Sequence, residues 1–231
     1  LIRGQNTNLA LNFGFDYKDS FNFQLNNEES RDRLRVGKIG LDLDISDNWN
    51  GRTIFSPEFD FGFARIMGGL KNKDPLHASR TGSGGKFVKN TTSLLRLQQL
   101  PFASTLLWRN EFQISPYILP ALEQFQIGGI ANVRGYPTAE YVGDKGYSMS
   151  WEWSCPPYPV PKDFNNPFTQ QKLYNALRLA MFYDWGNVRL YRPAAGEEET
   201  KTLSSAGWGI RFNLAKNFSI RADFAWPLDD H

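Results

Sequence analysis

The chain has 231 residues, a formal net charge of +2 and an aromatic content of 15%. The near balance of charge argues against a nucleic-acid-binding surface. The single cysteine, Cys155, excludes an internal disulfide framework and a cysteine-based metal site. Seven Trp and eighteen Phe are more than a soluble domain usually carries and are typical of a membrane β-barrel with aromatic girdles.

The mean hydropathy of −0.47 is compatible with that class, because each strand of such a barrel alternates lipid-facing and lumen-facing residues. No apolar run reaches 18 residues, so the sequence predicts no transmembrane helix.

Alternation of apolar and polar residues predicts five strands in the first half of the chain. Asp19 is the one polar residue on the apolar face of the first strand, and a polar turn is expected over 26–32. The alternation of the second strand slips at Gly37 and Lys38, which suggests a bulge. An exposed loop is expected over 67–86. The five strands are expected at 9–25, 34–45, 52–64, 87–100 and 102–114.

The second half of the chain predicts four more strands with the same alternation. A long connection over 115–146 precedes them, a Pro-rich connection covers 155–174, and an acidic loop covers 191–201. Lys216 and Asn217 form a tight turn. The four strands are expected at 147–154, 177–186, 207–214 and 218–226.

The alternation assigns the strand residues to two faces of an antiparallel sheet. The connections after the first, third, fifth and seventh strands are long and the others mostly short, as in outer-membrane barrels, and 155–174 is the exception. The apolar face should meet lipid and carry Leu11, Phe13, Phe61, Trp108, Trp151, Leu179, Ile210 and Phe224. The opposite face should point into the lumen and carry Glu152, Arg178, Asp184, Arg211 and Arg221.

The segment 125–136, Phe-Gln-Ile-Gly-Gly-Ile-Ala-Asn-Val-Arg-Gly-Tyr, is the most unusual part of the long connection. Its apolar residues, Ile130 among them, indicate a packed loop, and its glycines allow sharp backbone turns. Arg134 is its one charge, and a guanidinium suits bidentate pairing with a carboxylate. A surface loop with a chance arginine is equally compatible with this segment alone.

Three segments together carry a resemblance to a known family. The first is Gln124–Gly129 with Val133, Arg134, Gly135 and Tyr136, continued by Gly143–Tyr147; the second is Phe182–Gly186; the third is Gly207–Arg211. In this order and spacing they resemble the Omp85 superfamily, and they are most similar to its two-partner secretion transporters, the haemolysin-activator (ShlB/FhaC, or TpsB) family. The resemblance covers most of the chain and is most specific from about residue 122 onward.

The resemblance implies that residues 1–231 are part of one outer-membrane β-barrel of sixteen strands. The chain would then hold strands seven to fifteen, and 115–146 would be the sixth extracellular loop, folded inward. The first six strands, the last strand and the periplasmic POTRA domains would be absent. Nine antiparallel strands do not suit a closed bacterial barrel, so we expect an open sheet with edges at 9–25 and 218–228.

In the family, the loop arginine pairs with the acidic residue of the later strand motif, which here are Arg134 and Asp184. The alternation places Glu152 on the same face, so we expect it as a second partner. Small residues at Gly186, Gly207 and Gly209 would leave room for a docked loop, although Gly in a strand also marks bending. The alternative is that Asp184 and Glu152 are ordinary solvated residues of the lumen.

The resemblance implies a polypeptide transporter of the bacterial outer membrane, without a cofactor, that secretes a large exoprotein, an adhesin or cytolysin, in unfolded form through its barrel. Folding of the cargo outside would supply direction. A BamA-like insertase of outer-membrane proteins is the alternative. A soluble sandwich or barrel that binds a small ligand is a third hypothesis, which the rows of Trp and Phe contradict.

Catalysis finds little support in the sequence. His77 lies in a polar loop and His231 at the end of the chain, so neither suggests a catalytic triad. No set of ligands has the spacing of a zinc site. The Gly-rich segment 82–86 lacks the first Gly and the following Ser or Thr of a phosphate-binding loop.

Overall fold

The computed structural model describes residues 2–25, 27–158, 161, 163–164, 172–215 and 218–229. Its described residues form one large antiparallel sheet in which the strands follow chain order from β1 to β12, and a two-stranded sheet, β7 with β8, inside one loop. The strands of the large sheet are β1 (Ile2–Arg3), β2 (Thr7–Gln24), β3 (Asn27–Ser46), β4 (Gly51–Gly62), β5 (Phe87–Leu100), β6 (Ser104–Ile114), β9 (Lys145–Cys155), β10 (Leu177–Arg189), β11 (Thr200–Ala215) and β12 (Phe218–Pro227). The other elements are η1 (Ile66–Gly68), η2 (Ala121–Glu123), β7 (Phe125–Ile127), β8 (Tyr141–Gly143) and α1 (Leu173–Ala176).

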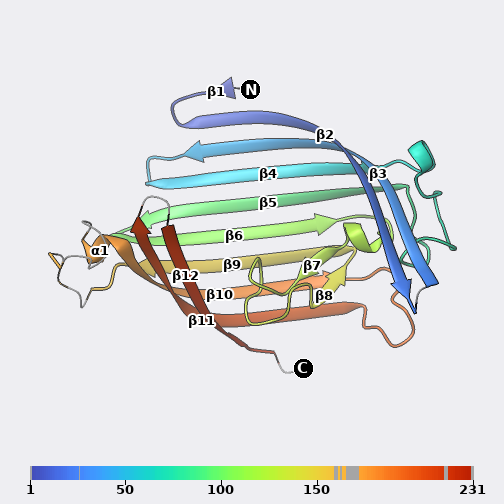
Figure 1. Ribbon diagram of the computed structural model, residues 1–231. Helices are drawn as coiled ribbons and strands as arrows, with labels where there is room; N and C mark the ends of the chain where they lie inside the picture. Colours follow the sequence, from blue (N-terminus) through green and yellow to red (C-terminus); the bar gives the residue numbers. More distant parts are fainter. Residues whose placement is uncertain are drawn as a thin grey trace.

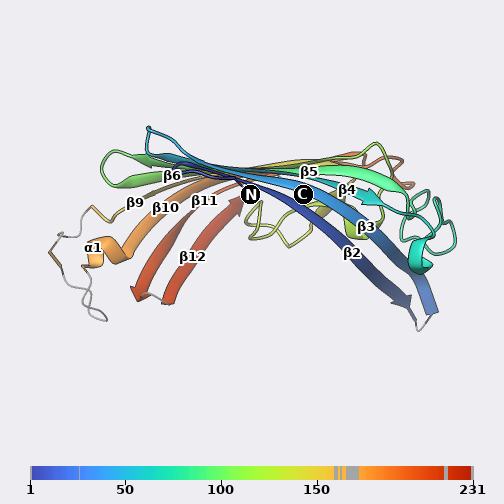
Figure 2. The same cartoon turned by 90° about the horizontal axis from the view of Figure 1, so that it is seen from above.

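The large sheet is open and curved (Figure 1). No ladder joins β12 to β1 or β2 within the described ranges. Seen from above, the sheet arches over the connection between β6 and β9, which lies on the concave side (Figure 2). The prediction of an all-β, antiparallel barrel fragment of about nine long strands is therefore confirmed.

The two faces of the sheet differ sharply in chemistry. Asp184 pairs directly with Ser150 and Ser205, whereas Trp151 pairs with Trp108 and Tyr183. Directly paired residues share a face, so these two rows lie on opposite sides, as the alternation predicted. We call the side that carries Asp184 the inner face, because the loop covers it. The outer face carries exposed apolar side chains, among them Leu11, Phe13, Phe59, Trp151, Leu179, Trp208 and Phe224.

The prediction of a turn over 26–32 is wrong, because β3 already begins at Asn27 and pairs with Gln24 of β2. At the end of this segment, a neighbouring loop binds Asp32 and the backbone of Arg31, so these polar residues do not end the strand. Asp32 accepts hydrogen bonds from the backbone and side chain of Ser79, and the Arg31 N–H donates to the His77 carbonyl. The strand therefore extends beyond the part that alternation alone would identify.

The prediction of a bulge at Gly37 and Lys38 is also wrong. The ladder from β3 to β4 runs unbroken from Val36 to Gly40, and the irregularity in the β2–β3 ladder lies at Asn22 and Phe23. The apolar residues change face because Leu34 and Val36 point inward. They pack in a buried cluster with Leu70, Phe87 and Leu119.

Three long loops lie at one end of the sheet and two short turns at the other, while the short β2–β3 connection lies at the end of the long loops (Figure 1). One end holds the loops 63–86, 115–144 and 190–199, while the turns 47–50 and 101–103 lie at the other. Cys155 and α1, which flank the connection expected at 155–174, lie at the end of the short turns. Cys155 itself is buried and unpaired at the end of β9. The turn expected at Lys216 and Asn217, like His231, falls outside the described residues. Within the described ranges, no helix has both the length and the apolarity to cross a membrane.

Candidate functional site

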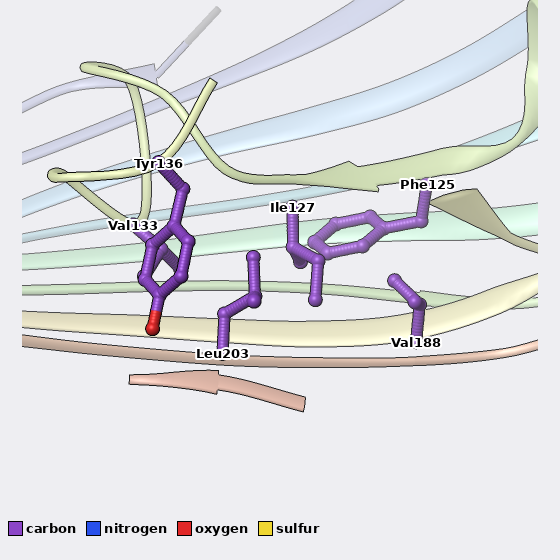
Figure 3. Packing of buried hydrophobic residues seen from close by; sticks show 6 residues of the cluster. All are labelled: Phe125, Ile127, Val133, Tyr136, Val188 and Leu203. Atoms are coloured by element: carbon purple, nitrogen blue, oxygen red, sulfur yellow. The ribbon is translucent and has the colours of Figure 1, made fainter. Parts of the chain in front are cut away.

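The loop between β6 and β9 packs as a folded unit against the inner face. Its strands β7 and β8 pair with each other, and its apolar side chains meet two residues of the wall, Val188 of β10 and Leu203 of β11 (Figure 3). The loop residues of this buried cluster are Phe125, Ile127, Val133 and Tyr136. Ile130, which the sequence suggested as part of the packing, is 73% exposed.

Glycine and asparagine shape the turn that carries Arg134. Gly128, Gly129 and Gly135 have φ of 104°, 96° and 91°, a region that side chains rarely adopt. The Asn132 side chain accepts the N–H groups of Gly128 and Val133, at 2.9 and 2.7 Å. These contacts fix the backbone on both sides of the turn and direct the following residue toward the wall.

Arg134 is buried against the inner face of β9 and β10, and all three nitrogens of its guanidinium donate hydrogen bonds. Its Nε and Nη2 donate to the two oxygens of Asp184 at 2.7 and 2.8 Å, and its Nη1 donates to Glu152 at 2.8 Å. Nη2 also donates to Ser150 at 3.2 Å, and the guanidinium lies 3.4 Å from the ring centroid of Phe182. The exposed fractions of the Arg134 and Asp184 side chains are 3% and 0%. The structure thus brings together the arginine and both carboxylates that the sequence singled out.

Three further charged residues surround this contact. Arg211 lies 2.9 Å from Glu152 and 2.6 Å from Asp223, and Arg221 lies 2.8 Å from Asp223. We call these six residues the Arg134 cluster: Arg134, Glu152, Asp184, Arg211, Arg221 and Asp223. Asp223 escaped the sequence analysis, although its alternation with Phe224 could have placed it on the inner face.

The wall glycines leave space that side chains of the loop and of the wall occupy. A Cβ on Gly207 would lie 2.4 Å from the Phe182 ring, and one on Gly209 would lie 2.2 Å from the Asp223 carboxylate. A Cβ on Gly186 would lie 2.9 Å from methyl groups of both Ile127 and Val133. The glycines therefore allow the loop and the charged side chains to approach the wall closely.

Tyr136 and Gly135 complete the contact of the turn with the wall. The Tyr136 hydroxyl donates to the Ser204 carbonyl at 2.8 Å. The Cα of Gly135 faces Ala225 of β12, since a Cβ there would lie 3.3 Å from the Ala225 Cβ. All four residues of the segment 133–136 thus contact β10, β11 or β12.

A second charged contact holds the loop on the other side of the inner face. Glu123 of η2 lies 2.8 Å from both Lys18 of β2 and Lys89 of β5. Lys89 also lies 3.6 Å from Asp60 of β4. We call these four residues the Glu123 cluster. The sequence analysis missed the Glu123 cluster because Glu123 has no distinctive neighbours in sequence. Lys18 and Lys89 lie 105 and 34 residues away from it.

A third charged contact joins the long loops at one end of the sheet. Asp144 is fully buried and lies 2.6 Å from Arg80. It also accepts the N–H groups of Leu119 and Tyr191, each at 2.7 Å. One carboxylate therefore ties the loops 63–86, 115–144 and 190–199 together. The sequence placed Asp144 in a family segment without assigning it a contact.

The chemistry available at these sites is reversible ion pairing. Within the described part of the chain, no group of three His, Cys, Asp or Glu side chains is placed to hold a metal ion. The arrangement can hold a loop against a wall and release it.

An open antiparallel sheet with an apolar outer face and a loop fixed on its concave side defines the fold class of a transmembrane β-barrel segment. Among solved structures, CdiB from Escherichia coli is similar to this chain, with a TM-score of 0.75 and 19% sequence identity. The match covers 99% of this chain and 40% of the CdiB chain, so this chain spans less than half the length of that relative. At this identity the likeness concerns the fold.

The sequence itself defines the family. The model of the haemolysin secretion/activation protein ShlB/FhaC/HecB family matches residues 1–212. The chain belongs to this family, which confirms the resemblance inferred from the three sequence segments. No curated protein matches the chain.

Proposed function

We propose that the chain is part of an outer-membrane pore that secretes a large partner exoprotein, an adhesin or cytolysin, in unfolded form. The observation that carries this proposal is the buried Arg134 cluster, which holds a folded loop against the inner face of a barrel-type sheet. Family membership favours secretion over the insertion of other outer-membrane proteins. On this proposal, the outer-face Trp and Phe side chains meet the lipid of the bacterial outer membrane.

The loop lies where cargo must pass. If the chain supplies strands seven to fifteen of a sixteen-stranded barrel, the inner face lines the lumen and the loop 115–146 is the sixth extracellular loop. The remaining strands and the POTRA domains then belong to the same full-length protein. An extended polypeptide in the lumen would compete with the loop for space, so the loop must undock or shift during export.

The Arg134 cluster defines the resting position of the loop. Removing one partner of a buried ion pair costs about 3–5 kcal/mol, because the other charge is left unpaired. Two nitrogens of the Arg134 guanidinium donate to the two oxygens of Asp184, which fixes the orientation of the two groups as well as their distance. The contact therefore sets the depth and direction of the loop turn.

Export by the full-length protein tests the proposal. Because the loop then lacks a defined resting position, we expect Arg134→Ala to reduce the secreted cargo by about tenfold or more, which corresponds to about 1.4 kcal/mol or more, while the barrel retains its heat-modifiable migration. Asp184→Ala should reduce export to a similar extent. The double variant should export no less than either single variant, since both substitutions remove the same contact.

Arg189→Ala is the matched control, because Arg189 pairs with Glu199 on the surface with side chains 58% and 52% exposed. Normal export by Arg134→Ala, with its barrel folded and its loop still docked, would refute the proposed role of the cluster.

A further inference from the structure

Arg109 of β6 is a guanidinium on the inner face that forms no ion pair or hydrogen bond with the described part of the chain. It pairs directly with Ser150 of β9, which in turn pairs with Asp184 of β10. The three side chains thus form one row across three strands. A small cavity of about 50 Å³ separates Arg109 and Ser150 from the loop residues Ala131 and Asn132. An unpaired cation therefore stands beside the docked loop.

The charges of the Arg134 cluster balance only while the loop is docked. The cluster then holds three arginines and three carboxylates. When Arg134 leaves, two arginines remain for the same three carboxylates, whose side chains are at most 10% exposed. A carboxylate left without its cation is unfavourable where it stays shielded from water, so another cation at the wall would stabilise the undocked state.

Arg109 is placed to supply that cation. Glu152 is its diagonal neighbour on the adjacent strand, a separation of about 7–8 Å that long side chains span. Ser150 lies between Arg109 and Asp184, and its hydroxyl already donates to Asp184 at 2.6 Å. Glu111, two residues along β6, is exposed to solvent, so it competes weakly for Arg109 with the buried carboxylates.

We propose that Arg109 is the counter-ion of the undocked state. When Arg134 withdraws, the Arg109 guanidinium pairs with Glu152 and reaches toward Asp184 through Ser150. Arg134 and Arg109 therefore act in opposite directions, since one stabilises the docked loop and the other the vacated wall. This inference rests on the proposed function in one respect, that the loop undocks during export, but its test requires no cargo.

Hydrogen–deuterium exchange of the purified full-length protein in detergent micelles measures the docking equilibrium. The Arg134 N–H donates to Asp184 at 3.2 Å, so its exchange requires undocking, and exchange rates report even rarely populated open states. We expect Arg134→Ala to accelerate exchange over residues 125–136. Arg109→Gln should slow it about tenfold, the factor expected from one charge-assisted hydrogen bond lost in the open state.

Two further variants serve as controls, one for the charge at position 109 and one for the loss of a guanidinium elsewhere on the inner face. Arg109→Lys retains the positive charge and should exchange within about twofold of the wild type, a difference below the worth of one charged hydrogen bond. Arg52→Gln removes an inner-face guanidinium that pairs with Asp44 on β3, away from the loop, and should leave exchange unchanged.

Unchanged or faster exchange in Arg109→Gln would overturn the inference. Loss of the folded barrel in that variant would also overturn it, because a residue without partners in the docked state should not be needed there. Slower exchange with undiminished export would support Arg109 as the counter-ion and count against the part of the proposed function that requires the loop to undock during export.

Discussion

The loop between β6 and β9 is held to the inner face by two clusters of opposite design. In the Arg134 cluster, the loop supplies the cation and β9 and β10 supply the carboxylates. In the Glu123 cluster, the loop supplies the carboxylate and β2 and β5 supply lysines. Both loop charges are almost fully buried, so burial alone does not separate the two sites.

The difference lies in geometry. Arg134 makes two parallel hydrogen bonds to one carboxylate and stacks on the Phe182 ring. Glu123 meets two ammonium groups, which are point charges on flexible stems, and one of them, Lys18, is 32% exposed on its side chain. The first site therefore fixes position and angle, whereas the second fixes charge and approximate distance. We expect substitutions to affect the two sites unequally.

Asp184→Asn should have the largest effect, because it leaves the buried Arg134 without its bidentate partner. Glu152 still binds Arg134 at 2.8 Å, so we expect the docking free energy to fall by about 3 kcal/mol, the lower end of the cost of breaking a buried pair, measured by hydrogen–deuterium exchange over residues 125–136. Glu123→Gln is the corresponding change at the other site and should cost less, since Lys89 keeps Asp60 as a neighbour. Equal losses would remove the distinction between the clusters.

Arg134→Lys should come next. An ammonium cannot reproduce the paired hydrogen bonds to Asp184, and a lost charged hydrogen bond costs about 1.5–3 kcal/mol. The reverse substitution at the Glu123 cluster, Lys89→Arg, should alter the docking free energy by less than about 1 kcal/mol, because a point-charge contact places little demand on angle. The same exchange experiment compares the two, and a fully docked Arg134→Lys would contradict the geometric argument.

Gly186→Ala should have a smaller effect. The new methyl group would lie 2.9 Å from methyl groups of Ile127 and Val133, so the loop must shift, at about 1 kcal/mol, the lower end of the usual cost of overpacking. Gly14→Ala is the control, since its Cβ would meet Lys38 at an ordinary 3.6 Å. Faster exchange in the control than in Gly186→Ala would refute this account of the wall.

The smallest effect should come from pH and is expected in the loop 63–86. Burial acts to raise the pKa of Asp74, but hydrogen bonds from His77 and from the N–H groups of Lys71 and Leu76 bring it below its usual value. This carboxylate therefore stabilises the loop at pH above about 4, the pKa of an unfolded Asp. That contribution is lost as the pH falls through the lower folded pKa.

A nitroxide on Leu76→Cys, in a Cys155→Ser background, would report this loosening as increased mobility below about pH 4. Asp74→Asn should remove the pH dependence. A pH response that persists in Asp74→Asn would assign it to another group.

Alternation was sufficient to divide the strands into two faces, because burial of one face enforces a period of two. The resemblance, and not the alternation, linked Arg134 to Asp184. Contacts between distant segments, such as Glu123 with Lys18 or Arg80 with Asp144, left no local pattern from which to predict them. The fold determines these contacts, and the sequence around each residue does not.

The prediction of a bulge at Gly37 and Lys38 failed for a physical reason that applies to other barrel strands. A change of apolar face was interpreted as a bulge, whereas the ladder is unbroken and Leu34 and Val36 pack under neighbouring loops. Val188 and Leu203 likewise lie on the otherwise polar inner face and pack against the loop. An inward apolar residue in a barrel strand therefore indicates where a loop docks.

The two clusters also have a mechanical consequence. They attach one stiff segment to widely separated strands, β2 and β5 on one side and β9 and β10 on the other, so the docked loop braces the arch of the sheet (Figure 2). If only the Arg134 contacts break, the segment stays attached to the wall through Glu123. The curvature of the wall is then no longer fixed by the loop, so on the proposed function undocking would clear the passage for cargo and also make its cross-section deformable.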